Sequence, residues 1–220
     1  MHSINPAANV NRSDSNKLPS RREAKQFTKR QQIKLAAKEL FGKQGYEGAT
    51  LRDIASKAQV ALGTVMLYAQ DKKDLVLLMY NDEIENALKV AGSKITANRS
   101  VLENLCAFFQ VFYERYAENL RLARTYLQIN FFAEGMNTAA LKVHRAHKRR
   151  LVATIVEMGQ AQGSLRSDVP PETMAEQILL LHRAAVRVWI ADDQPSVRRG
   201  LTNLKKILAL QIEGLAARKK

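Results

Sequence analysis

Apolar residues recur at intervals of three and four along most of the chain, which is the spacing of one face of an α-helix. The clearest stripe near the N-terminus consists of Ile33, Ala36, Ala37, Leu40 and Phe41. It predicts a helix from about Glu23 to Gln44, ended by Gly45. No run alternates apolar and polar residues as a half-buried strand would, and the chain holds only five prolines. The pattern predicts an all-α protein of about nine helices.

The stretch from residue 50 to residue 75 predicts two short helices joined by a tight turn. Thr50 and Asp53 have the S/T-x-x-D/E spacing of a capping box, so one helix should start there and run to about residue 57. A second helix is expected over 62–68, and Asp71 is placed to cap a longer helix that continues to about residue 92. Two short helices in this arrangement form a helix-turn-helix unit, whose second helix fits the DNA major groove.

From Arg30 to Leu75 the chain resembles the N-terminal domain of the TetR family of bacterial transcriptional regulators. The match runs over about 45 residues without a gap. It is carried by Ile33, Ala36, Ala37, Phe41, Gly45, Tyr46, Thr50, Ile54, Ala55, Ala58, Val60, Gly63, Thr64, Tyr68, Lys72 and Leu75. Beyond this domain the chain resembles the family only in its layout.

Three residues depart from the family pattern. Gln59 stands where the family usually has Gly in the turn, and a positive φ there would impose roughly 1 kcal/mol of strain. Met66 replaces the usual Tyr of the recognition helix, and Ala69 replaces the usual Phe. The operator sequence therefore cannot be transferred from a relative.

The resemblance implies DNA contacts from the recognition helix and from the ends of its neighbours. The matched positions are Thr50, Arg52, Leu62, Gly63, Thr64, Leu67, Tyr68 and Lys72. Arg52 is the strongest candidate for a base contact, because it is the only long bidentate donor in the set. Its alternative is a surface salt bridge to a nearby acid. Val65 is expected to face inward.

The positive charge is concentrated at the N-terminal end. The whole chain carries a net charge of +14, and residues 1–46 hold ten Lys or Arg and three acids, so ten minus three gives +7. This asymmetry suits a polyanionic partner. Residues 1–22 are expected to be a disordered basic arm that tracks phosphates or enters a minor groove, or else a passive tail. Lys29, Lys34 and Lys38 lie off the apolar stripe and are expected to face water or DNA.

The second half of the chain predicts five more helices. They are expected at about 101–116, 120–132, 138–162, 171–190 and 197–216. The first half of the helix at 138–162, which includes Lys142, Arg145 and Lys148, is expected to be basic and exposed. We therefore divide the chain into the arm at 1–22, a helix-turn-helix domain at 23–75 and a helical regulatory and dimerisation domain at 76–220.

Two apolar stripes run along the last two helices. One consists of Ile178, Leu181, Ala185 and Val188, and the other of Leu201, Leu204, Leu208, Ile212 and Leu215. The resemblance implies that this helix pair meets its copy as a four-helix bundle. A two-fold dimer would hold two recognition helices roughly 34–36 Å apart and would read a palindromic site. The alternative is that both stripes close the core of a monomer.

An aromatic and methionine cluster in the second domain could line an inducer pocket. The candidates are Phe108, Phe112, Tyr126, Phe132, Met158 and Trp189, and plain core packing is the alternative for each. His182 could bond a ligand or be a packed histidine. Cys106 lies in an apolar setting and is expected to be a buried, unreactive thiol. No cofactor or metal site is expected, because His144 and His147 sit in a cationic run that would repel a cation.

Together these features favour a sequence-specific repressor that a small molecule releases from its operator. The alternative is a basic helical protein that binds nucleic acid without sequence choice or ligand control. Nothing in the sequence supports an enzyme, since there is no Gly-rich phosphate loop and no G-x-S-x-G. The N-terminus lacks the apolar core of a signal peptide, and the most hydrophobic run, 178–191, is too short and too charged to span a bilayer. The expected location is the cytoplasm.

Overall fold

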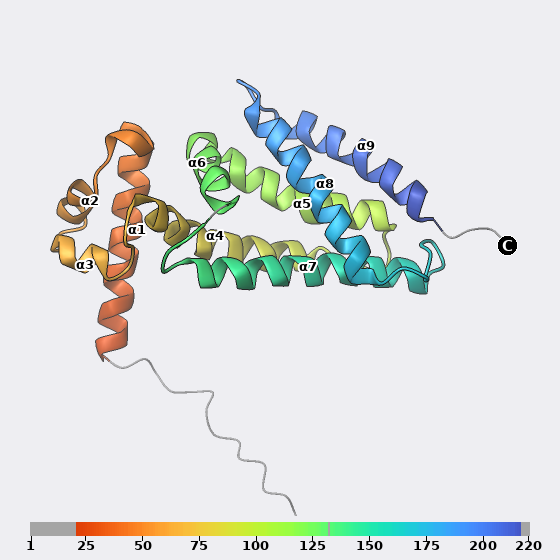
Figure 1. Ribbon diagram of the computed structural model, residues 1–220, viewed down its shortest axis with the longest axis horizontal. Helices are drawn as coiled ribbons and strands as arrows, with labels where there is room; N and C mark the ends of the chain where they lie inside the picture. Colours follow the sequence, from red (N-terminus) through yellow and green to blue (C-terminus); the bar gives the residue numbers. More distant parts are fainter. Residues whose placement is uncertain (1–20, 132, 217–220) are drawn as a thin grey trace, which may run out of the picture.

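The protein folds into helices connected by short turns. The structure is a computed structural model that describes residues 21–131 and 133–216, and within them it contains nine α-helices and no β-strand (Figure 1). The helices are α1 (Arg21–Gly48), α2 (Leu51–Lys57), α3 (Leu62–Met66), α4 (Lys72–Ser93), α5 (Val101–Ala117), α6 (Leu120–Phe131), α7 (Thr138–Ala161), α8 (Pro171–Ala191) and α9 (Val197–Leu215). The predicted all-α fold is confirmed. Of the expected arm at 1–22, residues 1–20 lie outside the described residues.

The helix boundaries agree with the sequence pattern to within a few residues. The largest differences lie in the N-terminal part, which we call the head (α1–α3). Helix α1 starts at Arg21, so the last two residues of the expected arm are helical. Helix α3 ends at Met66 rather than at Tyr68, because Leu67 is its C-cap and the chain then turns.

The head encloses a small apolar core to which each of its helices contributes. Ile33 and Phe41 come from α1, Ile54 from α2 and Val65 from α3, and all four are buried. Helix α2 packs against both α1 and α3. Val65 faces inward as predicted, so the core fixes which side of α3 remains outside.

Gly45 interrupts α1 and allows a second helix to approach it. Its φ of 76° and ψ of 170° are not helical, which confirms the predicted end of the regular helix. A side chain at this position would collide with the guanidinium of Arg121 on α6. The positive φ favours glycine here, and any larger residue would also require the Arg121 side chain to move.

Helix α4 connects the head to the rest of the molecule, which we call the body (α4–α9). Residues 74–81 are all buried. Helix α4 packs against α1 on one side and against α5, α6 and α7 on the other. Figure 1 shows the head at one end of an elongated molecule, with α1 steeply inclined to α4 and α7. The first half of α4 therefore fixes the orientation of the head on the body.

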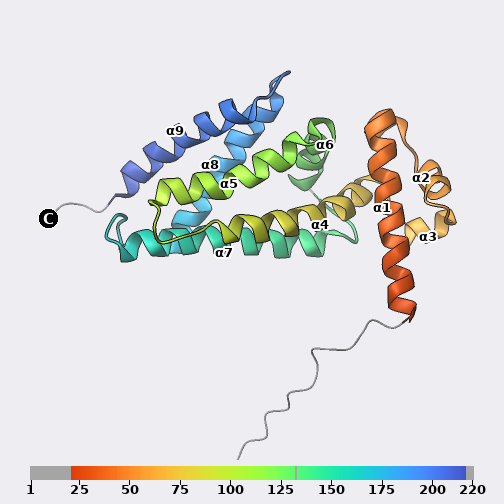
Figure 2. The same cartoon turned by 180° about the vertical axis from the view of Figure 1, so that it is seen from behind.

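The body is built around α5. Phe108, Phe109, Phe112 and Tyr113 of this helix are the largest of its fully buried side chains. Helices α4 and α7 lie side by side in both views (Figures 1 and 2), α8 packs on α7, and α9 covers α5 and α8. The aromatic face of α5 is thereby enclosed between α7, α8 and α9.

The two stripes that we expected to meet a second subunit contribute mainly to the core of the single chain. Ile178 and Ala185 of α8 and Leu204 and Leu208 of α9 are buried within it. Val188, the last residue of the α8 stripe, stays exposed at 67%, and so do two residues outside the stripes, Leu180 of α8 at 53% and Leu210 of α9 at 70%. Among the described helices, none is long and apolar enough to cross a membrane.

Candidate functional site

Helix α2 begins with the predicted capping box, which is confirmed. The Thr50 hydroxyl accepts from the Asp53 backbone N–H at 3.1 Å, and the Asp53 carboxylate accepts from the Thr50 N–H at 3.0 Å. The hydroxyl also donates to that carboxylate at 2.6 Å, and these bonds lower the pKa of Asp53. The hydroxyl proton of Thr50 is thus already used within the head, so its strongest contribution to an interface is to hold α2 in place.

The turn between α2 and α3 is closed by backbone hydrogen bonds and contains one strained residue. The N–H of Val60 donates to the Ala55 carbonyl at 3.0 Å. Gln59 has a φ of 55°. This positive value is the one expected at a position where the family usually has glycine, and it is unfavourable for glutamine. A non-glycine residue in this conformation is destabilised by about 1 kcal/mol.

The outward side of α3 is apolar rather than charged. Leu67 and Met66 are exposed by 72% and 50%, and no atom lies within 4 Å of the place where a Gly63 side chain would begin. Leu62 and Thr64 are half-buried beside them. Such a surface can contact thymine methyl groups and let the helix backbone approach bases closely. The four predicted contacts of α3, Leu62, Gly63, Thr64 and Leu67, lie on this one short segment.

Arg52 projects from α2 with all of its donors available. Its side chain is exposed. Within the described part of the chain it forms no hydrogen bond or ion pair, so the salt bridge that we considered as its alternative is not made there. An exposed, unpaired guanidinium suits a base edge or a phosphate.

Tyr68 and Lys72, the remaining predicted contacts, are both tied to α1. The Tyr68 hydroxyl donates to the Gln26 carbonyl at 3.2 Å. The Lys72 ammonium donates to the carbonyls of Tyr46 at 2.9 Å and Glu47 at 3.2 Å. An ammonium has three donors, so Lys72 retains one for a phosphate, whereas Tyr68 must leave Gln26 to donate to one.

The basic residues in the middle of α1 are bound to α4. Arg30 and Lys34 both pair with Asp82, and Lys38 pairs with Glu83 at 3.0 Å. Burial raises the pKa of Asp82, but the two cations outweigh it and the net pKa is lowered. The expectation that Lys34 faces water or DNA was therefore wrong, because its side chain is only 11% exposed, whereas Lys38 stays 52% exposed although it pairs with Glu83.

The first turns of α1 carry a group of cations of which the sequence analysis named only Lys29 as facing water or DNA. Arg21, Arg22, Lys25 and Lys29 form no ion pair within the described residues. The bond from Tyr68 to Gln26 places this half of α1 beside the end of α3. Their positions in the basic N-terminal run were the only signal in the sequence.

A polar link joins the head to the body where α4 begins. The buried carboxylate of Asp74 accepts from the backbone N–H groups of Gln70 at 3.1 Å and Asn137 at 2.9 Å. The side-chain amide of Asn137 donates to the Tyr68 carbonyl at 2.9 Å. Gly135 has a φ of 120°, and a side chain there would start 2.9 Å from the Asp74 carboxylate. The residue that precedes α7 is thus bonded to the segment that follows α3.

The structure divides the predicted ligand-binding residues among separate places in the body. The ring centroids of Phe108 and Phe112 lie 5.5 Å apart on α5. Tyr126 stacks on Tyr80 of α4 at 4.1 Å, and Trp189 packs on Tyr113 at 4.6 Å. The two others of the set are Met158, which is half-buried on α7, and Phe132, which lies outside the described residues. Ligand contact by any of the six stays a prediction.

Lys148 and His182 meet at the aromatic face of α5. Lys148, expected to be exposed with the rest of the basic half of α7, instead places its ammonium 3.6 Å from the centre of the Phe112 ring. Burial and the charge of Arg183 lower the pKa of Lys148 to about 7. His182 is buried and stacks on Phe109 with ring centroids 4.0 Å apart. His182 is therefore packed in the core, which was one of the two positions considered for it in the sequence analysis.

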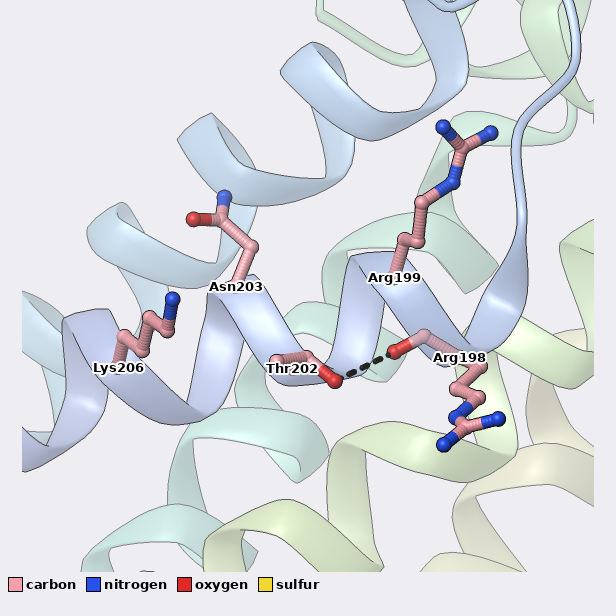
Figure 3. Close-up of a pocket in the computed structure, with 5 residues that line it drawn as sticks. All are labelled: Arg198, Arg199, Thr202, Asn203 and Lys206. Atoms are coloured by element: carbon pink, nitrogen blue, oxygen red, sulfur yellow. Dashed lines mark hydrogen bonds between the residues drawn. The ribbon is translucent and has the colours of Figure 1, made fainter.

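Two surface depressions lie along α9. The first, of about 380 Å³, is lined from this single helix by Arg198, Arg199, Thr202, Asn203 and Lys206, and Figure 3 shows the two arginines diverging from it. The second, of about 540 Å³, lies between α5 and α9 and includes Cys106. Cys106 is half-buried rather than buried as expected, and desolvation raises the pKa of its thiol, which is typical of an unreactive cysteine. Neither depression is lined by a predicted ligand-binding residue.

A family of known proteins matches the head. Residues 33–79 match the family model described as "Bacterial regulatory proteins, tetR family". The matched segment begins within α1 and ends within α4, so it includes the whole helix-turn-helix unit. No curated protein sequence matches the chain significantly.

Solved structures of regulators resemble both the head and the body. The regulator FadR from Bacillus subtilis in complex with stearoyl-CoA is 19% identical, with a TM-score of 0.67 over 84% of this chain and 98% of that chain. FadR from Thermus thermophilus, a TetR-family repressor in complex with lauroyl-CoA, is 24% identical, with a TM-score of 0.66 over 87% and 97%. SmeT, the repressor of the multidrug efflux pump SmeDEF of Stenotrophomonas maltophilia, is 15% identical, with a TM-score of 0.61 over 85% and 90%. At such identities the resemblance concerns the fold.

Proposed function

The chain belongs to the TetR family of bacterial transcriptional regulators, and we propose that it is a dimeric repressor which a small molecule releases from a palindromic operator. The observation that carries this function is the capped helix-turn-helix head. It presents one face of α3 to the outside and is fixed to the body by buried contacts of α4. A rigid body that positions two such heads is what a two-fold symmetric DNA site requires.

We assign the base contacts to α2 and α3 and the phosphate contacts to their surroundings. Arg52 reads a base edge in the major groove, and Leu62 and Leu67 contact thymine methyl groups. The remaining donor of Lys72 and the first turns of α1 bind phosphates on either side. Phosphate contacts set the register of the head, whereas the contacts of α2 and α3 set the sequence that it prefers.

Dimerisation uses the exposed face of α8 and α9. Leu180 and Val188 lie eight residues apart on α8 and so share one face, and Leu210 projects from the neighbouring helix. Burying large apolar side chains against a second copy is favourable by about 1.5–3 kcal/mol for each fully buried side chain. These three exposed side chains support the homodimer, and Val188 is the one among them that belongs to a predicted stripe.

Release from DNA is a shift between two conformations of the dimer. A ligand that binds better to the conformation with its heads out of register moves the population away from the operator. Two of the similar structures hold acyl-CoA and a third represses an efflux pump, so the likeness in fold leaves the ligand class open. A repressor of this kind acts in the cytoplasm, where the chromosome is.

Selection of bound fragments from the source genome tests this function. We expect enriched fragments to share an inverted repeat with half-sites about one DNA turn apart. The Arg52→Ala variant should keep its helicity but lose the enrichment. The opposing function, a basic helical protein without sequence choice, requires that all fragments bind with one steep salt dependence and no shared site. That outcome would overturn the proposal.

A further inference from the structure

Several buried polar groups in the centre of the body have no hydrogen-bond partner. Neither ring nitrogen of His182 has a partner within the described residues, and nor does the hydroxyl of Tyr113. Lys148 beside them is half-buried, and its ammonium has no acceptor there either: its contacts are with the rings of Phe112 at 3.6 Å and Phe109 at 5.7 Å. More than nine-tenths of buried polar groups in folded proteins are paired, so a cluster of unpaired ones calls for a partner.

The unpaired groups surround the same aromatic rings. The His182 ring lies 4.0 Å from that of Phe109 and 6.4 Å from that of Phe112, and the Tyr113 ring lies 6.1 Å from His182. Lys148 comes from α7, His182 from α8 and Tyr113 from α5, so three helices supply the donors. The unpaired groups therefore border one set of fully buried aromatic rings.

The cluster has an excess of positive charge. Burial lowers the pKa of His182, and the charges of Lys148 and Arg183 lower it further, so the imidazole is neutral. Arg183 pairs with Glu176 at 3.0 Å, which leaves Lys148 without a counter-charge. Partial burial of a cation without a counter-charge is unfavourable, and an apolar residue of similar size would avoid that cost at this position. Water could satisfy a donor but could not neutralise the ammonium.

We propose that Lys148, His182 and Tyr113 bind the carboxylate of a monoanionic inducer, whose apolar part packs against Phe109 and Phe112. The proposal rests on the ligand-controlled function proposed above and names the class of the ligand. One ammonium beside a neutral histidine balances one negative charge, so a monocarboxylate fits the site better than a phosphate ester or another multiply charged group. The imidazole N–H and the phenol hydroxyl supply the further donors that a buried carboxylate needs.

The position of Lys148 gives this site a direct connection to the head. It lies on α7 eleven residues after Asn137, which is about 16 Å along one continuous helix. Asn137 is the residue that bonds to Asp74 and to the Tyr68 carbonyl. A carboxylate bound by Lys148 therefore acts on the helix whose N-terminal end is bonded to the segment after α3.

Titration of the full-length chain with carboxylates and their amides tests the site. The probes are the straight-chain carboxylates from acetate to dodecanoate, together with benzoate, each compared with its primary amide by calorimetry and thermal shift in the absence of DNA. We expect at least one carboxylate to bind, and its amide to bind at least tenfold more weakly. Absence of binding by every carboxylate, or equal binding of acid and amide, would overturn the proposal.

Substitutions on α7 separate the site from general effects of charge. Lys148→Met should weaken carboxylate binding at least tenfold, whereas Lys142→Met, at an exposed lysine on the same helix, should not change it. Without ligand, Lys148→Met should also raise the melting temperature, because it removes a half-buried cation that has no counter-charge. Retained affinity, or a lower melting temperature without ligand, would show that Lys148 is a structural residue. If a carboxylate binds but the protein stays on operator DNA, the binding site is supported and the role of the carboxylate as an inducer is contradicted.

Discussion

Asn137 and Asp74 are joined by a hydrogen bond of 2.9 Å from the backbone N–H of the first to the buried carboxylate of the second. The two residues lie 63 positions apart, one just before α7 and the other in the first turn of α4. The side chain of Asn137 continues the link to the Tyr68 carbonyl. A movement of the body at this point therefore reaches the segment after α3 through hydrogen bonds rather than through a flexible connection.

We expect Asn137→Ala to weaken operator binding about tenfold and to reduce the free energy of unfolding by about 1–3 kcal/mol. The substitution keeps the backbone bond to Asp74 but leaves the Tyr68 carbonyl without its donor. Fluorescence anisotropy with operator DNA and urea unfolding measure the two effects. Asn86→Ala, at an exposed position on α4, is the matched control and should change neither. Full operator affinity in Asn137→Ala would show that the link does not position α3.

The helices could be predicted from the sequence because their signals are local. Apolar spacing and caps such as Thr50 and Asp71 act within one or two turns, and both caps are present in the structure. The positive φ of Gln59 could likewise be predicted, because Gln59 occupies a turn position where the family usually has glycine. The expected DNA contacts also lie close along the chain, on α2, on α3 and in the segment from α3 to the first residue of α4.

The features that were missed depend on partners far along the chain. Lys34 looked free until Asp82, 48 residues later, was placed beside it. Lys148 belonged to a basic run, and only the packing of α5 against α7 shows that it turns inward. The inward and outward faces of α8 and α9 could not be separated either, because both carry large apolar residues. Local pattern defines the elements, whereas tertiary packing decides which charges stay available.

Arg52 should contribute to both affinity and base preference. Arg52→Ala is expected to weaken operator binding by about 1–3 kcal/mol and to relax the preference at one base pair in each half-site. Arg52→Lys should restore part of the affinity but little of the preference, because an ammonium cannot form the bidentate pair. Binding to a set of operators, each with one base pair changed, measures both. A uniform loss across the set would identify Arg52 as a phosphate contact.

Gln59 offers a test of strain in the turn of the helix-turn-helix. Gln59→Gly should raise the free energy of unfolding by up to about 1 kcal/mol, because glycine tolerates a φ of 55° whereas glutamine does not. Gln59→Val should lower it, since a β-branched residue is less tolerant still. Thermal unfolding of the three proteins gives the order. If Gly and Val shift the melting temperature in the same direction, side-chain contacts rather than backbone strain dominate at this position.

The stability of the ligand-free protein should increase with pH above about 7. The pKa of Lys148 is lowered from 10.5 to about 7, so between these values the unfolded chain holds a proton at this residue that the folded chain lacks. The free energy of unfolding then rises by up to about 1.4 kcal/mol per pH unit. Urea unfolding at pH 6 to 10 should show this rise in the wild type and in Lys142→Met. In Lys148→Met it should be absent, and persistence there would assign it to another group.

Two valines of equal exposure separate dimerisation from general solubility. Val188 on α8 and Val143 on α7 are exposed by 67% and 65%. Val188→Asp should dissociate the dimer, because it introduces a charge into the proposed apolar contact, and Val143→Asp should leave it intact. Analytical ultracentrifugation over a range of concentrations measures the change. Dissociation in both variants, or in neither, would move the dimer contact away from α8.

The first half of α4 belongs to two apolar cores at once, and this limits how regulators of this type can be recombined. Residues 74–81 are buried, and just beyond them Asp82 and Glu83 hold Arg30, Lys34 and Lys38. A chimaera that grafted this DNA-reading unit onto another regulator would have to carry the chain from Arg21 through Glu83. Grafts joined earlier would leave basic side chains of α1 without their acids and would replace half of the surface on which that helix rests.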